Sequence, residues 1–319
     1  MKPFDFITFG ETMVRLSPPN KQTIEQAASL DMHIGGSESN TAMTLARLGL
    51  RAAWVSKLVD NPLGRKIAST LASQGVDVSG VVWTGKGRNS TYFVEFGAPP
   101  RPHRVTYDRR HSAINTLKLS EVEWSLFERA RIVHLTGITP ALSDACRRVA
   151  LSIMEHARTQ RSLISFDVNY RSKLWSPRRA RNVLEPMCSK ANILFVGYDD
   201  AVTVMGATGE PEYIAEELAA RFGCHTVAVT LSRGGAVCLH KGKLLRSQAL
   251  HTTEVDRLGA GDAFSAGFLF GYLTGNVQYA VEFATAISAL KFTIPGDACL
   301  VTKADVDAAL NFTGVRIQR

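Results

Sequence analysis

The sequence predicts an α/β protein with a mainly parallel central sheet and helices on both of its faces. Short, continuously apolar runs rich in β-branched residues alternate with segments of helical period along most of the chain. Strands of this kind belong to parallel sheets that helices cover on both sides. The chain has 319 residues, 45% of them hydrophobic and 21% charged, so it is long enough to bury such a core.

The expected elements follow this alternation from the N-terminus onward. Strands are expected at 4–10, 52–59, 131–135, 162–168, 192–196 and 226–231. Helices are expected at 38–48, 63–73, 141–159, 177–189 and 211–222. Gly49 and Gly75 follow the first two helices, as residues that end a helix commonly do. A later helix, which begins near residue 260, is apolar on nearly all sides and is expected to be buried.

Residues 79–108 break the alternation. They show no helical period, and three strand-like runs at 81–83, 90–96 and 105–107 are joined by turns rich in Gly and Pro. The middle run alternates between apolar and polar residues, which suits a sheet with one wet face. We therefore expect a single domain over 1–319 that carries a small antiparallel β lid, formed mainly by 79–108, with 12–17 as a candidate further strand. The alternative is an edge hairpin of the main sheet.

The positive charge is concentrated in two places. Lys and Arg number 37 against 29 Asp and Glu, a net charge of +8. The stretch 101–110 carries +3 and the stretch 171–181 carries +5, so the rest of the chain is formally neutral. This pattern favours two local anion sites over nucleic-acid binding, which usually needs a continuous basic face. The alternative for any single arginine is a solvated basic surface.

The cysteines and the N-terminus indicate where the protein works. The five cysteines are scattered, odd in number and without a C-x-x-C pair, which argues against a disulfide framework or a zinc site. The first residues include acids and no cleavable apolar stretch, and no run approaches the ~18 apolar residues of a membrane span. We expect a cytoplasmic protein that does not enter a membrane.

The segment Gly259-Ala260-Gly261-Asp262 is the strongest candidate for chemistry. Small residues at a helix start let backbone N–H groups converge on an anion, and the helix dipole favours negative charge there. We expect a positive φ at Gly261. The Asp262 carboxylate could take the proton of an attacking hydroxyl while the turn holds charge on a phosphate. The alternative is an ordinary acid in the first turn of a helix.

With Asp256 upstream, this run resembles the D-T-x-G-A-G-D signature of the ribokinase-like sugar kinases, the pfkB family. The chain departs from that signature at Arg257 and Leu258, where the family often carries Thr. The resemblance implies that Asp262 is the catalytic base and that Gly259, Ala260 and Gly261 form the anion-holding turn. We refer to residues 259–261 as the anion turn.

The N-terminal half carries the family's other signature. Gly35 and Gly36, followed by Asn40 and a helix, resemble its G-G-x-x-x-N turn; the alternative is a helix cap. The two signatures extend the resemblance over nearly the whole chain. It implies a ribokinase-like fold, sugar binding by Gly35, Gly36 and Asn40, the use of ATP, Mg²⁺ and a monovalent cation, and a homo-oligomer that forms through the lid.

Two further segments resemble the 2-keto-3-deoxygluconate kinases of this family. Residues 166–175 match D-x-N-x-R-x-x-L-W, and residues 107–113 match Y-x-R-x-x-S-A except that His111 stands where Gly is common. The match implies that Tyr107 and Arg109, with Tyr92 from the lid, bind the sugar. It places Arg171 at the sugar carboxylate or at the transferred phosphate. Guanidinium groups suit carboxylates, although a phosphorylated sugar would fit them equally well.

The nucleotide and metal residues are expected from the same resemblance. Thr230, Ser232, Gly235 and Ala289 would bind ATP, together with Gly259 and Gly261. The family's N-x-x-E segment is missing, and Asp200 stands at the Glu position, with Gly197 at the Asn position. Asp200 is expected to act on Mg²⁺ through water, because Mg²⁺ prefers oxygen ligands and keeps several waters. The alternative is a first-turn helix acid.

These observations predict an ATP-dependent kinase that phosphorylates the primary hydroxyl of 2-keto-3-deoxygluconate to give the 6-phosphate. The alternatives are a kinase for another keto-deoxy acid, for fructose or for a nucleoside, and a non-catalytic sugar-acid sensor. The sensor is disfavoured because Asp262 is present.

Overall fold

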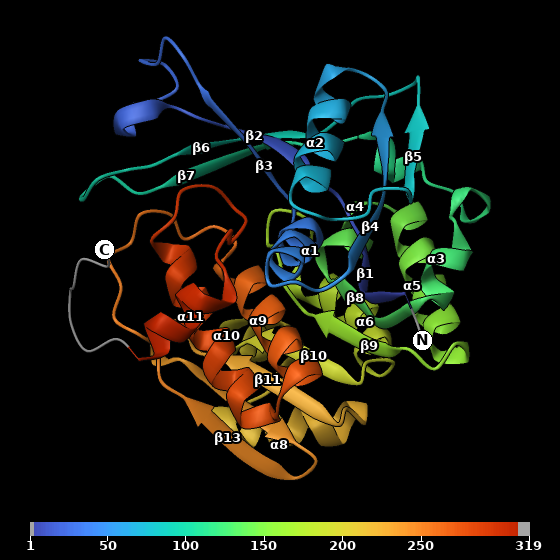
Figure 1. Cartoon of the computed structure of the whole chain (residues 1–319), viewed down its shortest axis with the longest axis vertical. Helices are drawn as coiled ribbons and strands as arrows, with labels where there is room; N and C mark the ends of the chain where they lie inside the picture. The colour runs from blue at the N-terminus through green and yellow to red at the C-terminus, as the bar shows by residue number, and fades with distance from the viewer. Residues whose placement is uncertain (1–2, 312–319) are drawn as a thin grey trace.

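The computed structural model describes residues 3–311, and a nine-stranded sheet forms its centre (Figure 1). The strands lie in the order β13-β12-β11-β10-β9-β8-β1-β4-β5. Their bounds are β1 (Phe4–Phe9), β4 (Ala52–Val59), β5 (Val81–Thr84), β8 (Ala130–Thr136), β9 (Leu163–Asp167), β10 (Ile193–Gly197), β11 (Thr226–Thr230), β12 (Ala236–His240) and β13 (Lys243–Ser247). All neighbours from β11 to β5 are parallel, and only β12 and β13 are antiparallel, which confirms the predicted α/β class.

Helices cover both faces of this sheet. One face carries α1 (Ser37–Arg47), α2 (Pro62–Ser73), α9 (Ala260–Thr274), α10 (Val277–Phe292) and α11 (Lys303–Leu310). The other carries α3 (Trp124–Glu128), α4 (Ile138–Leu142), α5 (Asp144–Thr159), α6 (Pro177–Cys188) and α8 (Pro211–Phe222). Alternate strand residues enter the two cores: Phe195 packs on the α9 side, and Leu194 and Val196 pack on the other. The strands are therefore apolar on both sides, as the sequence predicts.

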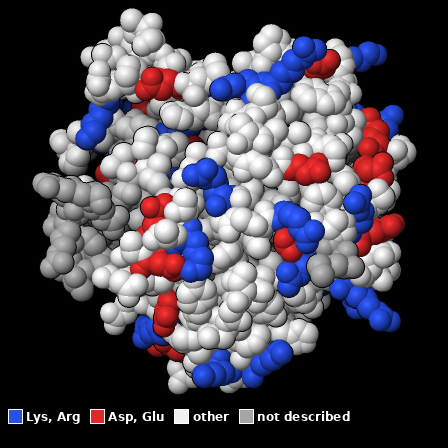
Figure 2. Space-filling view, in the orientation of Figure 1, with Lys and Arg blue, Asp and Glu red and all other residues white. Residues whose placement is uncertain are grey.

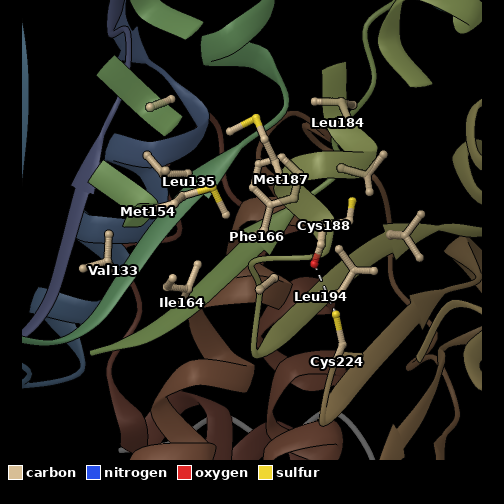
Figure 3. Packing of buried hydrophobic residues seen from close by; sticks show 14 of the residues in the cluster. Val133, Leu135, Met154, Ile164, Phe166, Leu184, Met187, Cys188, Leu194 and Cys224 are labelled. Atoms are coloured by element: carbon tan, nitrogen blue, oxygen red, sulfur yellow. Dashed lines mark hydrogen bonds between the residues drawn. The ribbon is translucent and has the colours of Figure 1, made fainter. Parts of the chain in front are cut away.

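Figure 3 shows the core beneath α5 and α6. Leu135 of β8, Phe166 of β9, Leu194 of β10 and Met154 of α5 belong to this core, and all four are fully buried. Full burial of one such side chain contributes about 1.5–3 kcal/mol. All five cysteines of the chain are buried and free, including Cys188 and Cys224, which a sulfur-to-carbonyl hydrogen bond joins in Figure 3.

A second sheet of four strands lies across one end of the molecule (Figure 1). Its order is β3 (Asp31–Gly35), β2 (Met13–Ser17), β6 (Thr91–Glu95) and β7 (Arg104–Asp108). Residues 12–17 thus supply one strand and residues 91–108 supply two. We refer to these four strands as the second sheet.

Two expectations about the second sheet are wrong in detail, and one of its strands was not expected. Val81–Thr84 pairs in parallel with β4 and extends the main sheet, because the chain after α2 returns beside β4. The second sheet is not wholly antiparallel, since β2 and β6 run parallel. Strand β3 was not expected, because its first residues, Asp31 and Met32, are exposed and show no apolar alternation.

No helix within residues 3–311 is long and apolar enough to cross a membrane. On the face drawn in Figure 2, Lys and Arg lie interspersed with Asp and Glu and form no continuous stripe.

Candidate active site

The anion turn begins at a glycine that no other residue could replace without strain. Gly259 has a φ of 83°, and a side chain there would overlap the backbone carbonyl of Asp297. Helix α9 starts at the next residue. The expectation of a positive φ at Gly261 is wrong: a Cβ at Gly261 would meet no protein atom within 4 Å, and its φ lies outside the left-handed region. Gly261 thus leaves open space in front of the turn.

Asp262 lies in the first turn of α9 and is held by α1. Its Oδ1 accepts a hydrogen bond from the Ser37 hydroxyl at 2.5 Å, and its Oδ2 accepts one from the Asn40 amide at 2.8 Å. Asn169 donates in turn to the Ser37 hydroxyl at 2.8 Å. Burial raises the pKa of Asp262, and the two hydrogen bonds oppose that rise. The carboxylate is therefore fixed in direction and made more basic than an exposed one.

Two more carboxylates lie near Asp262, and Arg171 lies among the three. Burial, followed by the charges of Asp262 and Asp200, raises the pKa of Asp167 to about 8. Burial also raises the pKa of Asp200, whose Oδ2 accepts the Tyr170 N–H at 3.0 Å. Arg171 is close enough to lower the pKa of all three, against the effect of burial. Arg171 makes no salt bridge with the residues in the range 3–311.

These carboxylates fit a magnesium ion that also binds phosphates. No group of three or more His, Cys, Asp or Glu side chains in the described part of the chain could chelate a metal alone. Mg²⁺ is commonly bound by one or two carboxylates plus phosphates and water, so it needs no complete protein cage. Asp199 and Asp200 line a groove of about 630 Å³ together with Thr230 and Ser232.

A cavity of about 530 Å³ opens beside the anion turn and shares Thr230 and Ser232 with that groove. Five residues expected at the nucleotide line this cavity: Thr230, Ser232, Gly235, Gly261 and Ala289. Ala260 lines it as well, whereas Gly259 is not among the lining residues. Phe264 and Phe292 supply apolar walls that no sequence motif indicates. The cavity is large enough for a small organic ligand.

On the second-sheet side, Arg109 is already paired with a buried acid. Its guanidinium binds Glu11 Oε2 at 2.6 Å and 2.8 Å, and the hydroxyls of Ser90 and Ser112 donate to Glu11 Oε1. Arg109 is 9% exposed and lies over the Tyr107 ring. Glu11 could not be found from the sequence, because nothing near residue 11 indicates an ion pair to residue 109. The two basic stretches thus differ: Arg109 is neutralised by Glu11, and Arg171 is not paired.

Tyr92 and the predicted glycines also contact protein groups. The Tyr92 hydroxyl donates to the Asp297 carboxylate, and Tyr92 stacks on Tyr107. A side chain at Gly35 would overlap the Tyr92 hydroxyl and Asp297, and one at Gly36 would overlap the Glu11 carbonyl. These glycines therefore permit close packing within the protein itself.

Further contacts join the second sheet to the main body. Arg15 of β2 is fully buried and binds Asp297 at 2.6 Å and Asp256 at 2.7 Å. Lys173 donates to the Val105 carbonyl at 2.6 Å, next to Tyr107. The segment after β9 and the loops around the anion turn thus both reach the second sheet.

The fold and this site define a carbohydrate kinase. A model of the pfkB family carbohydrate kinases matches residues 5–303, so the chain belongs to that family. It is a phosphotransferase that acts on an alcohol group.

Two relatives and one solved structure that this chain resembles are named as kinases of keto-deoxy sugar acids. The chain is 39% identical to a 2-dehydro-3-deoxygalactonokinase of Haloferax volcanii over 99% of both chains. It is 33% identical to a 2-dehydro-3-deoxygluconokinase of Bacillus subtilis, over 92% of this chain and 91% of that one. The crystal structure of a 2-dehydro-3-deoxygluconokinase from Thermotoga maritima matches with a TM-score of 0.92 and 35% identity, over 96% and 98% of the two chains.

A more distant structure shares the fold. A protein described as a ribokinase II from E. coli, solved with ATP and Mg²⁺, matches with a TM-score of 0.88 and 19% identity, over 97% and 99% of the two chains.

Proposed function

We propose that this protein transfers the γ-phosphate of ATP to the primary hydroxyl of a 2-keto-3-deoxy sugar acid. One observation carries the proposal: a buried, hydrogen-bonded Asp262 directly follows an anion turn whose Gly261 faces a ligand-sized cavity. The relatives named for keto-deoxy sugar acids at 33% and 39% identity support the substrate class.

The residues of the site suit an in-line phosphoryl transfer. The substrate hydroxyl oxygen attacks the γ-phosphorus, its proton passes to Asp262, and the bond to the β-phosphate oxygen breaks to release ADP. The backbone N–H of Gly261, which faces the cavity, would hold the charge that develops on the phosphoryl group, whereas that of Ala260 already donates to the Arg257 carbonyl at 3.3 Å. Ser37 and Asn40 keep the Asp262 carboxylate aimed at the hydroxyl, because they bind one oxygen each.

The ATP would lie in the cavity lined by Thr230, Ser232, Gly235 and Ala289, with its phosphates toward Gly261. Asp200 and Asp167 would hold Mg²⁺ through water, and the ion would supply neutralisation of phosphate charge. The raised pKa of Asp167 supports this role, since a nearby cation would relieve the repulsion among the three carboxylates.

The finer substrate is one of two epimers. The sequence alone favours 2-keto-3-deoxygluconate, whereas the relative at 39% identity is named for the galactonate, which differs only in configuration at C4. Arg171, Tyr107 and Arg109 would bind groups common to both acids, so they do not discriminate between them. We propose that both epimers are phosphorylated at C6.

An ADP-release assay with purified protein and MgATP tests the proposal. The panel comprises both keto-deoxy acids, their 6-phosphates, fructose and a nucleoside, with Asp262→Asn as the inactive control. We expect turnover of both unphosphorylated acids and a much lower kcat/KM for the neutral sugars. A preference for fructose would refute the substrate class. Binding of the acids by calorimetry without ADP release would instead identify a sensor.

We also propose that the second sheet forms the contact of a homo-oligomer. Met32 is 48% exposed on β3, at one edge of this sheet, and Arg104 and Thr106 are exposed on β7, at the opposite edge. Light scattering on the wild type and on Met32→Asp tests this, with a monomeric wild type as the refuting result.

A further inference from the structure

A lysine is enclosed behind the anion turn, where the mechanism above gives it no part. Lys291, in the last turn of α10, has no exposed surface. Its Nζ donates to the backbone carbonyl of Asp256 at 3.0 Å and to that of Ile294 at 2.9 Å. Asp256 lies three residues before Gly259, and Ile294 lies in the loop after α10. The ammonium therefore joins the two loops that flank the turn.

The surroundings of this ammonium are strongly polar. Burial lowers the pKa of Lys291, and the nearby carboxylates of Asp256 and Asp297 oppose that fall, whereas Arg15 adds to it. Arg15 binds both carboxylates from the side of the second sheet. Two buried cations and two buried anions thus form one cluster, which we refer to as the four-charge cluster.

The four-charge cluster sits directly against the anion turn. The Asp256 carboxylate accepts the N–H groups of Leu258 and Gly296, each at 3.0 Å, so it ties the start of the turn to the loop after α10. That loop also carries Asp297, whose carbonyl leaves no room for a side chain at Gly259. A shift of either loop would therefore move the anion turn itself.

A bound monovalent cation would need the oxygen atoms that Lys291 already holds. Hard cations are held by backbone carbonyls and carboxylates, and these are the groups around Nζ. The family resemblance implies a monovalent cation, but the residues here do not fit one, because the ammonium occupies the space between the two loops. We infer that Lys291 is a built-in cation that takes the place of a bound monovalent ion and positions the anion turn.

This role makes the protein independent of added K⁺, and removal of the ammonium should create that dependence. Lys291→Met suits the test, since its terminal methyl reaches about as far as the lysine Cε and leaves a gap where Nζ lay. Lys57→Met is the matched control: Lys57 is also buried, but its Nζ binds Glu121, away from the turn. Wild type and both variants are compared in chloride salts of K⁺, NH₄⁺, Na⁺ and choline at equal ionic strength.

We expect the wild-type kcat/KM to vary by less than about twofold among the four salts. For Lys291→Met we expect a loss of about 10- to 100-fold in choline, the range for a lost charged hydrogen bond, with recovery in K⁺ or NH₄⁺. Lys57→Met should show no dependence on the salt. Activation of the wild type by K⁺ would overturn the inference, as would equal activity of Lys291→Met in all four salts.

The comparison of kcat/KM rests on the proposed function, so a second measurement does not depend on turnover. The thermal unfolding midpoint of Lys291→Met should rise on replacing choline with K⁺ or NH₄⁺, while the wild-type midpoint stays constant. If the variant folds poorly in choline, its soluble yield in K⁺ against choline gives the same comparison. A salt-independent midpoint and yield would overturn the inference whatever the substrate proves to be. Absence of any kinase activity in the wild-type protein would refute the proposed function but would leave the inference about Lys291 standing.

Discussion

The Asn40 amide donates to the Asp262 carboxylate at 2.8 Å, although 222 positions separate the two residues. The contact forms because α1 and α9 share one core on the same face of the sheet, so that their N-terminal ends meet. Two glycine-rich segments, each opening a helix, thereby become one site. Since Ser37 holds the other carboxylate oxygen, Asp262 has little freedom to turn away from a substrate.

Asp262→Asn should remove the proton acceptor and leave the fold intact. Asparagine keeps an oxygen that Ser37 can bind, so we expect an unchanged circular dichroism spectrum and nearly unchanged ATP affinity. The kcat should fall by at least ~10²- to 10⁴-fold, the usual contribution of general-base assistance.

The control for this variant is Asp144→Asn, because Asp144 is an exposed acid in the first turn of α5. It should keep wild-type turnover. If Asp262→Asn retains more than about a tenth of the wild-type kcat, Asp262 is not the base.

Local patterns were sufficient to predict six of the nine strands of the main sheet, β1, β4, β8, β9, β10 and β11, and the helices α1, α2, α5, α6, α8 and α9. The strand at 226–231 and the helix at 211–222, for example, correspond closely to β11 (Thr226–Thr230) and α8 (Pro211–Phe222). Such segments bury their own residues whatever their neighbours are, so their periodicity reveals them. Strand β3 could not be found in this way, because pairing with β2 defines it and its own side chains are partly exposed.

The site residues also differ in whether a local sequence pattern reveals them. Gly259 and Asp262 stand out because a turn followed by a buried helix has a local signature. Glu11 and Lys291 act through partners far away in sequence, or through backbone carbonyls that have no signature at all. Only the tertiary structure shows that Arg109 is neutralised by Glu11.

The two glycines of the anion turn should respond in opposite ways to substitution by alanine. Gly259→Ala should lower the melting temperature, because position 259 has a positive φ and no room beside the Asp297 carbonyl. Gly261→Ala should keep or raise it, since the new Cβ meets no protein atom and alanine favours a helix by about 1 kcal/mol.

At position 261 we expect substitution to lower activity although it does not lower stability. Gly261→Ala, and more strongly Gly261→Val, should weaken ATP affinity and turnover, because the added atoms enter the cavity. Calorimetric unfolding and ATP titration check both sites. Near-normal ATP affinity and turnover in Gly261→Val would show that the turn does not approach the phosphates.

Asp167 should make the protein less stable as the pH rises from about 4 to about 8. The unfolded carboxyl ionises near ~3.9, whereas burial and the charges of Asp262 and Asp200 raise the folded pKa to about 8. Between these values the folded state retains a proton that the unfolded state has lost, so stability falls with increasing pH. Asp167→Asn removes this titration.

Urea unfolding at pH 5, 6.5 and 8 measures the effect. The stability of Asp167→Asn relative to wild type should increase steadily across this series, while Asp144→Asn, at an exposed carboxylate, should show a constant difference. A constant difference for Asp167→Asn as well would mean that Asp167 does not carry a raised pKa.

The last prediction concerns the different roles of Arg109 and Arg171, although the sequence suggests the same role for both. If both bind the substrate carboxylate, Arg109→Ala or Arg171→Ala should lower kcat/KM for the acid sugar by about 10- to 100-fold, with a much smaller loss for fructose. Lysine at either position should restore only part of the activity, because it keeps the charge and loses the planar fork.

Stability should distinguish the two arginines, because their surroundings differ. Arg109→Ala leaves Glu11 buried with two serine hydroxyls and no cation, and breaking a buried pair in this way costs about 3–5 kcal/mol. Arg171 is exposed and forms no salt bridge within residues 3–311, so Arg171→Ala should lower the unfolding temperature much less than Arg109→Ala does. The double variant Glu11→Gln/Arg109→Ala should recover part of the lost stability, which identifies the unpaired carboxylate as the cause.

Equal losses of kcat/KM on acidic and neutral sugars in both single variants would refute the carboxylate assignment. Equal losses for Arg171→Ala alone would place Arg171 at the transferred phosphate, in keeping with its position among Asp167, Asp200 and Asp262.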